Sequence, residues 1–242
     1  MPKNIAVLSY YNNRVANLVI KKLCEKKIKI KCVILIGEEE KKSVKKNYLN
    51  YTNSLKGVEL KHLKKYKLRY LFVKNTNSLE VKKIIKRNDI KILLNYSGLI
   101  KEDILNIKNL KILNSHPGML PFYRGSMCPE WTILNKEKKV AVTSHILDKN
   151  LDTGPIVVSK KLKYPYPRNY FNFRKEVYEL EGIVTIQAIR LVNKKKNFKK
   201  QNLKQGKTYK PMDKDSIKIV KNILKKRLIW QGKIKKLLTI NF

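Results

Sequence analysis

The sequence is poor in cysteine, with Cys24, Cys32 and Cys128 as the only three among its 242 residues. They form no C-x-x-C pair and leave an odd number, so the sequence indicates neither a disulfide framework nor a zinc site. Long hydrophobic runs are also lacking, since "CVILIG" and "ILL" are far too short to cross a bilayer. We therefore expect a cytoplasmic protein in a reducing compartment, with no bound metal and no membrane contact.

Acidic residues are scarce as well: 18 Asp and Glu stand against 56 Lys and Arg, which gives a formal net charge of +38. A field of that sign attracts polyanions, phosphorylated substrates and anionic surfaces. The lysines are nevertheless spread over the whole chain beside many Asn and Ile, which is what compositional drift also produces. The charge leaves nucleic acid open as a partner, but we favour the interpretation that most of the lysines lie on solvated surfaces.

What the sequence does contain is an alternation of short apolar runs with segments of helical periodicity. "NIAVLSY" predicts a buried strand, residues 14–26 a helix, and "IKIKCVILIG" a second strand. Strands are then predicted at "RYLFV", "IKILLNYSG", "LKILNSH", "VAVTSHIL" and "GPIVVSKKLKY", with helices over about 77–87, from Lys101 and from about Arg174. This order predicts an α/β fold with a mostly parallel twisted sheet and helices on both faces.

The composition changes near Lys194. From there to the end we count 17 Lys and Arg but two Asp. We therefore divide the chain into a main domain, residues 1–193, and a basic C-terminal extension, residues 194–242. The extension holds one amphipathic helix near 215–229, packs a little and is otherwise a solvated tail. A basic insert at 38–69 has no role that we can assign.

The stretch "NSHPGMLPFYRG", residues 114–125, has almost no charge in this lysine-rich chain. Asn114 and His116 lie two residues apart at the end of a predicted strand, so their side chains point the same way. Pro117 keeps His116 extended, and we expect Gly118 to turn the chain away without covering the imidazole. An amide that can fix a carbonyl, beside an imidazole that can move a proton, indicates an active site; a turn with a structural histidine is the alternative.

A second polar stretch, "VTSHILDKNLDTGPI", supplies two carboxylates. Asp152 precedes a Thr-Gly-Pro turn, where a carboxylate can project into a crevice, raise the basicity of an imidazole and accept a proton. For Asp148 we favour a role in organising the loop by bonding backbone amides. His145 alternates with Thr143 and Leu147 along a strand, which favours a packing or positioning role.

Together the two stretches, with the spacing between them, resemble the folate-dependent formyltransferase family, which includes glycinamide ribonucleotide transformylase, methionyl-tRNA formyltransferase and the sugar-nucleotide N-formyltransferases. The resemblance runs from "NIAVLS" to about residue 192. It implies a Rossmann-like catalytic domain that uses 10-formyltetrahydrofolate as cosubstrate and needs no metal. It also implies that the family's catalytic Asn, His and Asp fall on Asn114, His116 and Asp152.

The same resemblance implies where the folate binds. "ILLNYSGLIKEDIL" is similar to the strand and loop that line the folate in this family. Tyr96, Ser97, Leu99 and Ile100 are therefore candidate pterin contacts, chiefly through backbone groups, and Asp148 is a further candidate for contact with the cosubstrate.

Three features bear on the acceptor amine. The transformylase-like members carry a glycine-rich, phosphate-holding loop after the first strand, whereas this chain has "SYYNNRVAN". Methionyl-tRNA formyltransferases resemble the chain in "NYSGLI" but have a C-terminal β-barrel for tRNA, and residues 194–242 hold too few β-rich runs to predict one. Trp131 follows Arg124 by seven positions, a spacing similar to that of the sugar-nucleotide formyltransferases.

We therefore expect a small-molecule amine as substrate, an amino sugar linked to dTDP, UDP or GDP, with Arg124, Trp131, Tyr10 and Tyr11 as its candidate contacts. From the residues alone, Trp131 as a core aromatic and Arg124 as a loop anchor stay open. Formylation of methionyl-tRNA or glycinamide ribonucleotide also stays open, as do a homodimer and a catalytically silent, nucleic-acid-binding protein.

Overall fold

The computed structural model describes residues 4–37, 58, 60–162, 169–194 and 197–238. Within these residues the predicted alternation of strands and helices is confirmed. Most of the basic insert expected at 38–69 lies outside the described residues, namely 38–57 and 59.

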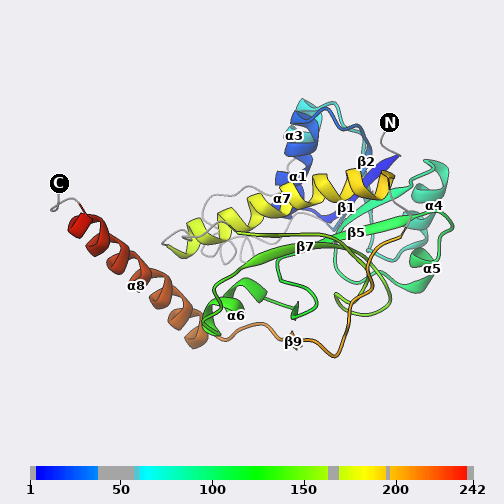
Figure 1. Cartoon of the computed structure of the whole chain (residues 1–242). Helices are drawn as coiled ribbons and strands as arrows, with labels where there is room; N and C mark the ends of the chain where they lie inside the picture. Colours follow the sequence, from blue (N-terminus) through cyan, green and yellow to red (C-terminus); the bar gives the residue numbers. More distant parts are fainter. Residues whose placement is uncertain (1–3, 38–57, 59, 163–168, 195–196, 239–242) are drawn as a thin grey trace.

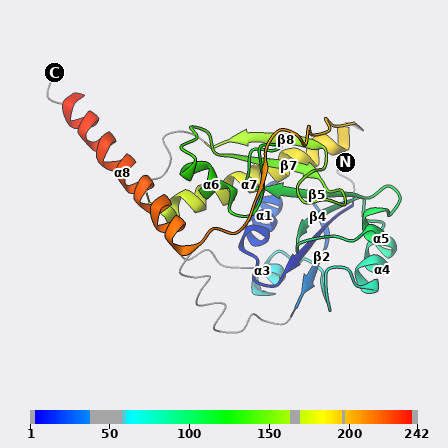
Figure 2. The ribbon, with the colours of Figure 1, turned by 90° about the horizontal axis from the view of Figure 1, so that it is seen from below.

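A seven-stranded sheet forms the centre of the fold, in the order β3-β2-β1-β4-β5-β7-β8. Strands β1 to β5 are parallel, and β7 runs antiparallel to both β5 and β8 (Figures 1 and 2). This is the mostly parallel, Rossmann-like sheet that the sequence predicts. The strands are β1 (Ile5–Tyr10), β2 (Ile30–Ile36), β3 (Tyr70–Val73), β4 (Ile92–Tyr96), β5 (Lys111–His116), β7 (Ala141–Ile146) and β8 (Ile156–Lys161).

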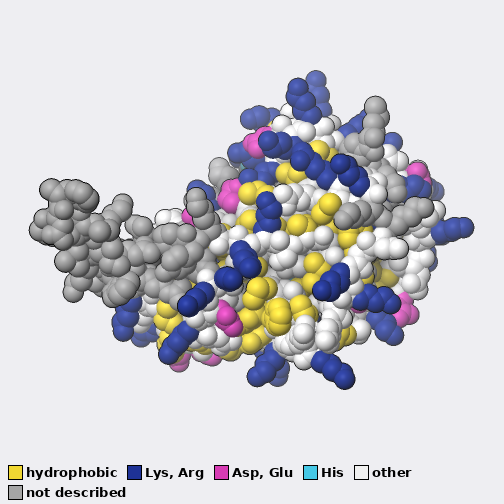
Figure 3. Space-filling view, in the orientation of Figure 1, with side chains coloured by type: hydrophobic (Ala, Val, Ile, Leu, Met, Phe, Trp, Pro, Cys, Tyr) yellow, Lys and Arg dark blue, Asp and Glu magenta, His cyan; other side chains and the backbone are white. Residues whose placement is uncertain are grey.

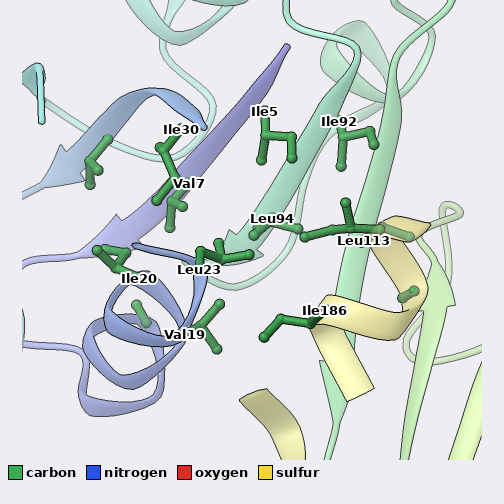
Figure 4. Packing of buried hydrophobic residues seen from close by; sticks show 14 of the residues in the cluster. Ile5, Val7, Val19, Ile20, Leu23, Ile30, Ile92, Leu94, Leu113 and Ile186 are labelled. Carbon is green, nitrogen blue, oxygen red and sulfur yellow. The ribbon is translucent and has the colours of Figure 1, made fainter. Parts of the chain in front are cut away.

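Helices cover both faces of this sheet, because alternate residues of its apolar strands point to opposite sides. On one face, Ile5 and Val7 of β1 pack with Val19 of α1 (Arg14–Glu25) and Ile186 of α7 (Tyr170–Lys194), as Figure 4 shows. On the other face, Ala6 and Leu8 pack in a cluster that includes residues of α4 (Leu79–Arg87) and α5 (Glu102–Leu105). A short helix, α3 (Leu60–Lys65), adds Leu63 to the first cluster.

The chain after α7 packs more closely than its composition indicates. Strand β9 (Lys207–Tyr209) pairs in parallel with β6 (Tyr123–Gly125) in a separate two-stranded sheet. Helix α8 (Lys214–Leu238) buries Ile217, Val220 and Leu224 in a cluster shared with α7 and α6 (Cys128–Leu134). Helix α8 covers the amphipathic helix expected near 215–229, and most other residues from 199 to 224 are exposed, as expected of a solvated extension. The pairing of β9 with β6 was not predicted. The end of α8 extends away from the body in Figure 1.

Lysine and arginine side chains are scattered over the face in Figure 3, between hydrophobic and uncharged groups, instead of forming one continuous basic surface. Among the described residues, we find no helix that combines the length and apolar character needed to span a membrane.

Candidate active site

A cleft of about 390 Å³ lies at the carboxyl ends of β4 and β5. It sits where the strand order reverses between β1 and β4, the usual place for a ligand in an open α/β sheet. Its walls come from the start of α1, the segment after β4, the end of β5, the β7–β8 loop and the first half of α7. The residues from these elements include Asn13, Tyr96, Asn114, Asp152, Tyr178 and Glu181.

Asn114 and Asp152 are brought together in this cleft. Nδ2 of Asn114 lies 3.5 Å from Oδ1 of Asp152, although 38 residues separate them in the chain. Antiparallel pairing of β5 with β7 places the β7–β8 loop beside the end of β5. Asp152 has a left-handed backbone, with φ of 54°, and this conformation turns its side chain toward Asn114 and His116.

His116 lies behind Asp152 and does not line the cleft. Its Nδ1 is 3.3 Å from Oδ2 of Asp152, its Nε2 is 2.8 Å from the carbonyl oxygen of Tyr123, and the residue is 3% exposed. The expectation that Gly118 leaves the imidazole uncovered is wrong. A Cβ at Gly118 would come within 2.3 Å of Nε2, so glycine allows the loop to cross directly over the ring.

Burial and hydrogen bonding set the protonation of this pair. Burial lowers the pKa of His116, and the opposing effects of Asp152 and the Tyr123 carbonyl do not cancel it. Burial acts to raise the pKa of Asp152, but contacts with His145, His116 and the Gly125 amide outweigh it, so this pKa lies below its ordinary value. Near neutral pH, Asp152 is therefore a carboxylate, and burial disfavours the charged form of His116.

His145 joins the same cluster from β7. It is fully buried, and its Nε2 lies 3.5 Å from Oδ1 of Asp152 and 3.3 Å from Nδ2 of Asn114. Its Nδ1 is buried and finds no hydrogen-bond partner among the described residues. A bare Nδ1 is the less costly state there, which places the proton on Nε2, where it can be donated to Asp152.

Three of the four candidate pterin contacts line the cleft: Tyr96, Leu99 and Ile100. Leu99 is 69% exposed, whereas the hydroxyl group of Tyr96 lies 3.1 Å from that of Thr185 on α7. Ser97 is buried, and its hydroxyl donates to Oδ1 of Asn95 within the same turn, outside the cleft lining.

Asp148 also lines the cleft, and it organises the loop as its sequence position suggested. Its Oδ1 accepts hydrogen bonds from the Asn150 amide at 3.1 Å and from the Thr153 hydroxyl at 2.7 Å. Together these bonds shape the loop that carries Asp152.

The four candidate acceptor contacts lie outside the cleft lining. Arg124 is 8% exposed. Its guanidinium donates hydrogen bonds to the carbonyls of Pro121, Leu203 and Gly206, and it therefore anchors the chain after α7. Nε1 of Trp131 donates to the carbonyl of Lys210 at 3.0 Å. These contacts support the loop-anchor and packing alternatives for both residues.

Tyr10 and Tyr11 lie at the end of β1. Tyr10 is half exposed, and its hydroxyl is near Gly98, which lines the cleft. The ring of Tyr11 is 6.0 Å from that of Phe72. Tyr10 is therefore near the rim of the cleft, and Tyr11 packs away toward β3.

Sequence reasoning missed the polar wall that α7 gives to the cleft. Arg174, Tyr178 and Glu181 all line it, and Nη2 of Arg174 donates to the Tyr178 hydroxyl at 2.8 Å. Burial raises the pKa of Glu181 to about 8, with Arg174 opposing the shift. The spacing of four and three residues on one helix is a signal that could have found them.

Arg174 is also held from the far side of the cleft wall. Its Nε lies 3.5 Å from Oε1 of Glu130 on α6, a carboxylate oxygen that also accepts from the Tyr170 hydroxyl at 2.9 Å.

In the part of the chain that the structure describes, no three His, Cys, Asp or Glu residues are grouped to hold a metal ion.

The family of this chain follows from comparison with known proteins. A family model described as "Formyl transferase" matches residues 3–189, and the chain belongs to that family. The methionyl-tRNA formyltransferase of Thermodesulfovibrio yellowstonii is 36% identical over 83 residues, which cover 34% of this chain and 27% of that protein. The one from Thermotoga maritima is 27% identical over 159 residues, covering 64% and 50%. The matched parts thus span about a quarter to a half of these relatives.

Solved structures share the fold at low sequence identity. Glycinamide ribonucleotide transformylase 1 from Symbiobacterium toebii superposes with a TM-score of 0.62 at 16% identity, covering 82% of this chain and 93% of that one. The N-formyltransferase from Helicobacter canadensis, solved with folinic acid and dTDP-3-aminofucose, gives 0.61 at 18% identity, covering 86% and 70%. These likenesses bear on the fold alone.

Proposed function

We propose that this protein transfers a formyl group from 10-formyltetrahydrofolate to a primary amine, and that the amine belongs to a nucleotide-linked sugar. The observation that carries the proposal is the contact of Asn114 with Asp152 at the cleft, with His116 against the far side of the same carboxylate. An amide donor next to an ionised carboxylate is what acyl transfer to an amine requires.

The residues of the cleft fit the formyl donor. Leu99 and Ile100 offer apolar surface to a pterin ring, and the backbone after β4 offers polar groups beside them. When bound, this cosubstrate supplies an electrophilic formyl carbon. We expect Tyr96 and Asp148 to border it, while Ser97 supports the turn from behind.

In the proposed reaction the amine nitrogen bonds to the formyl carbon, and the bond from that carbon to the folate nitrogen breaks. Asn114 donates a hydrogen bond to the formyl oxygen as negative charge develops there. Asp152 accepts the proton of the amine, directly or through water, and the proton then passes to the departing nitrogen. For His116 to donate to the same oxygen, its Nε2 must first leave the Tyr123 carbonyl.

The β1–α1 junction supports an acceptor other than glycinamide ribonucleotide. Asn13 occupies the place of a glycine-rich phosphate loop: its Oδ1 accepts from the Ala16 amide at 2.9 Å, and its Nδ2 lies 3.2 Å from the Tyr96 carbonyl. The helix amide is thereby partly satisfied within the chain, which leaves less for a phosphate. The Helicobacter canadensis neighbour, with its bound dTDP-sugar, motivates the choice of nucleotide sugars.

A second candidate acceptor is methionyl-tRNA, which the names of the curated relatives favour. Purified protein should be incubated with 10-formyltetrahydrofolate and, in turn, with dTDP-, UDP- and GDP-linked amino sugars, glycinamide ribonucleotide and initiator methionyl-tRNA. Tetrahydrofolate release and product mass report the transfer. One added formyl group on a nucleotide sugar is the expected result. Formylation of the tRNA alone would replace the proposed acceptor, and no transfer to any amine would overturn the proposed function.

A further inference from the structure

The segment from Lys199 to Lys210, which we call the C-terminal strap, contacts two loops of the active site: the β7–β8 loop and the loop that covers His116. Near its start, Nε2 of Gln201 donates to the carbonyl oxygens of Asp152 at 3.0 Å and Gly154 at 2.7 Å. Further along, the Lys207 amide donates to the Phe122 carbonyl, in the loop that covers His116. A part of the chain that composition sets apart as a basic extension thus contacts the backbone of the proposed catalytic residue.

The β7–β8 loop has a conformation that needs such support. Asp152 is a non-glycine residue in the left-handed region, which is disfavoured unless the surrounding structure fixes it. Gly154 approaches the other arm of the loop so closely that a Cβ there would lie 1.8 Å from the Ile146 carbonyl oxygen. Asp148 holds the loop from inside, and Gln201 holds it from outside.

The two hydrogen bonds of Gln201 also fix which way its amide faces. Both acceptors are carbonyl oxygens, so only the NH₂ end of the side chain can face them. Its Oε1 is buried and has no hydrogen-bond partner within the described part of the chain. A rotated amide would set oxygen against two carbonyl oxygens, and the observed orientation is therefore the favourable one.

We propose that Gln201 is a positioning residue that holds Asp152 in reach of Asn114 and His116. The proposal deepens the formyl-transfer function and rests on it. Gln201 touches neither the cleft nor the reacting atoms; it acts through the backbone of Asp152. Its loss is expected to let the carboxylate drift while the folate surface after β4 stays in place.

The activity test compares Gln201→Met, which keeps the length of the side chain but lacks the donors, with Gln205→Met, an exposed position on the same strap. We expect kcat to fall at least tenfold in the first variant, with KM for both substrates within about threefold, and no such change in the second. In an Asp152→Asn background, Gln201→Met should add little further loss. A full additional tenfold loss there, or wild-type kcat in the single variant, would overturn the proposal.

A second readout does not depend on formyl transfer. The chain has only three histidines, so NMR can follow each imidazole as pH changes, with His62 on α3 as an internal reference. His116 faces Asp152 and His145; burial lowers its pKa overall, and the contact with Asp152 acts in the opposite direction. We expect Gln201→Met to lower the pKa of His116, because the carboxylate of Asp152 is then held less closely to the ring. Gln201→Ala, which removes the donors without adding charge, serves if the Met variant does not fold.

The two readouts separate the two proposals. If the wild type formylates no amine but Gln201→Met still shifts the His116 titration, the proposed function fails and the positioning contact stands. If the wild type is active and neither kcat nor the titration responds in a folded variant, the role of Gln201 is refuted and the function is kept.

Discussion

The backbone amide of Gly125 donates a hydrogen bond of 2.9 Å to Oδ2 of Asp152, the same oxygen that lies 3.3 Å from Nδ1 of His116. One carboxylate oxygen thus joins the imidazole to the loop that covers it. Gly125 has φ of 90°, and a Cβ there would lie 2.3 Å from the Tyr209 carbonyl oxygen. Gly125 is therefore one of the residues at which the site and the strap meet, and it couples the position of the loop to the geometry of the carboxylate.

Replacing the three proposed catalytic residues should remove turnover and keep the fold. For Asn114→Ala, which removes a donor to the developing oxyanion, we expect kcat to fall about 10²- to 10³-fold. Asp152→Asn and His116→Ala should lower it at least as far. Steady-state rates check this, with circular dichroism to confirm folding. Asn172→Ala, at an exposed position on α7, is the control. Full activity in any of the three variants would remove that residue from the mechanism.

The loop over His116 leaves no room for a side chain at Gly118. In Gly118→Ala the new Cβ meets both the imidazole and the Tyr123 carbonyl, so we expect a loss of stability of about 1–3 kcal/mol and a strong loss of activity. The matched control is Gly37→Ala, where nothing lies within 4 Å and only the positive φ of 83° is unfavourable. Urea unfolding measures the stability of the two variants, and steady-state rates measure their activity. A larger effect on activity at Gly37 than at Gly118 would contradict this account.

Arg124 should behave as an anchor of the strap. Arg124→Met removes its hydrogen bonds to the carbonyls of Pro121, Leu203 and Gly206, and we expect the free energy of unfolding to fall by about 1–3 kcal/mol. Limited proteolysis should then cut the strap faster, while KM for the acceptor stays close to that of the wild type. A tenfold rise in that KM at unchanged stability would instead make Arg124 a substrate contact.

Glu181 should make stability depend on pH. Burial raises the pKa of its carboxyl group to about 8 from an ordinary 4.5, so between these values the folded chain holds a proton that the unfolded chain has lost. The contribution of Glu181 to stability therefore falls as pH rises from about 5 to 8 and is constant above. Glu181→Gln should remove this dependence and raise stability at pH 9 by on the order of 5 kcal/mol.

Urea unfolding at several pH values between 5 and 9 tests the Glu181 prediction. Glu80→Gln, an exposed carboxylate in the first turn of α4, is the matched control and should leave the pH dependence as it is in the wild type. Parallel curves for wild type and Glu181→Gln over this range would show that Glu181 is ionised throughout.

Much of the fold could be predicted because its signals are local. Runs such as "NIAVLSY" and "KILLNY" are apolar on both faces, which in water is stable only inside a covered sheet. The helices between them were predicted from their apolar spacing, and α1 and α4 begin and end within two residues of the predicted bounds. The contacts of the strap were not predicted, because its lysines dominate the composition while its pairing with β6 and the two hydrogen bonds of Gln201 join residues far apart in the chain.

By itself the sequence placed Asn114 and His116 together at the end of a strand, because alternation along a strand is a property of the backbone. It also placed Asp152 in a loop suited to a carboxylate. Only the tertiary structure decided that His116 lies under a loop, that His145 and Gln201 reach Asp152, and that α7 lines the cleft with Glu181. These contacts join residues far apart in the chain. They depend on strand register and on how the elements pack against one another, and neither is encoded in a local stretch of sequence.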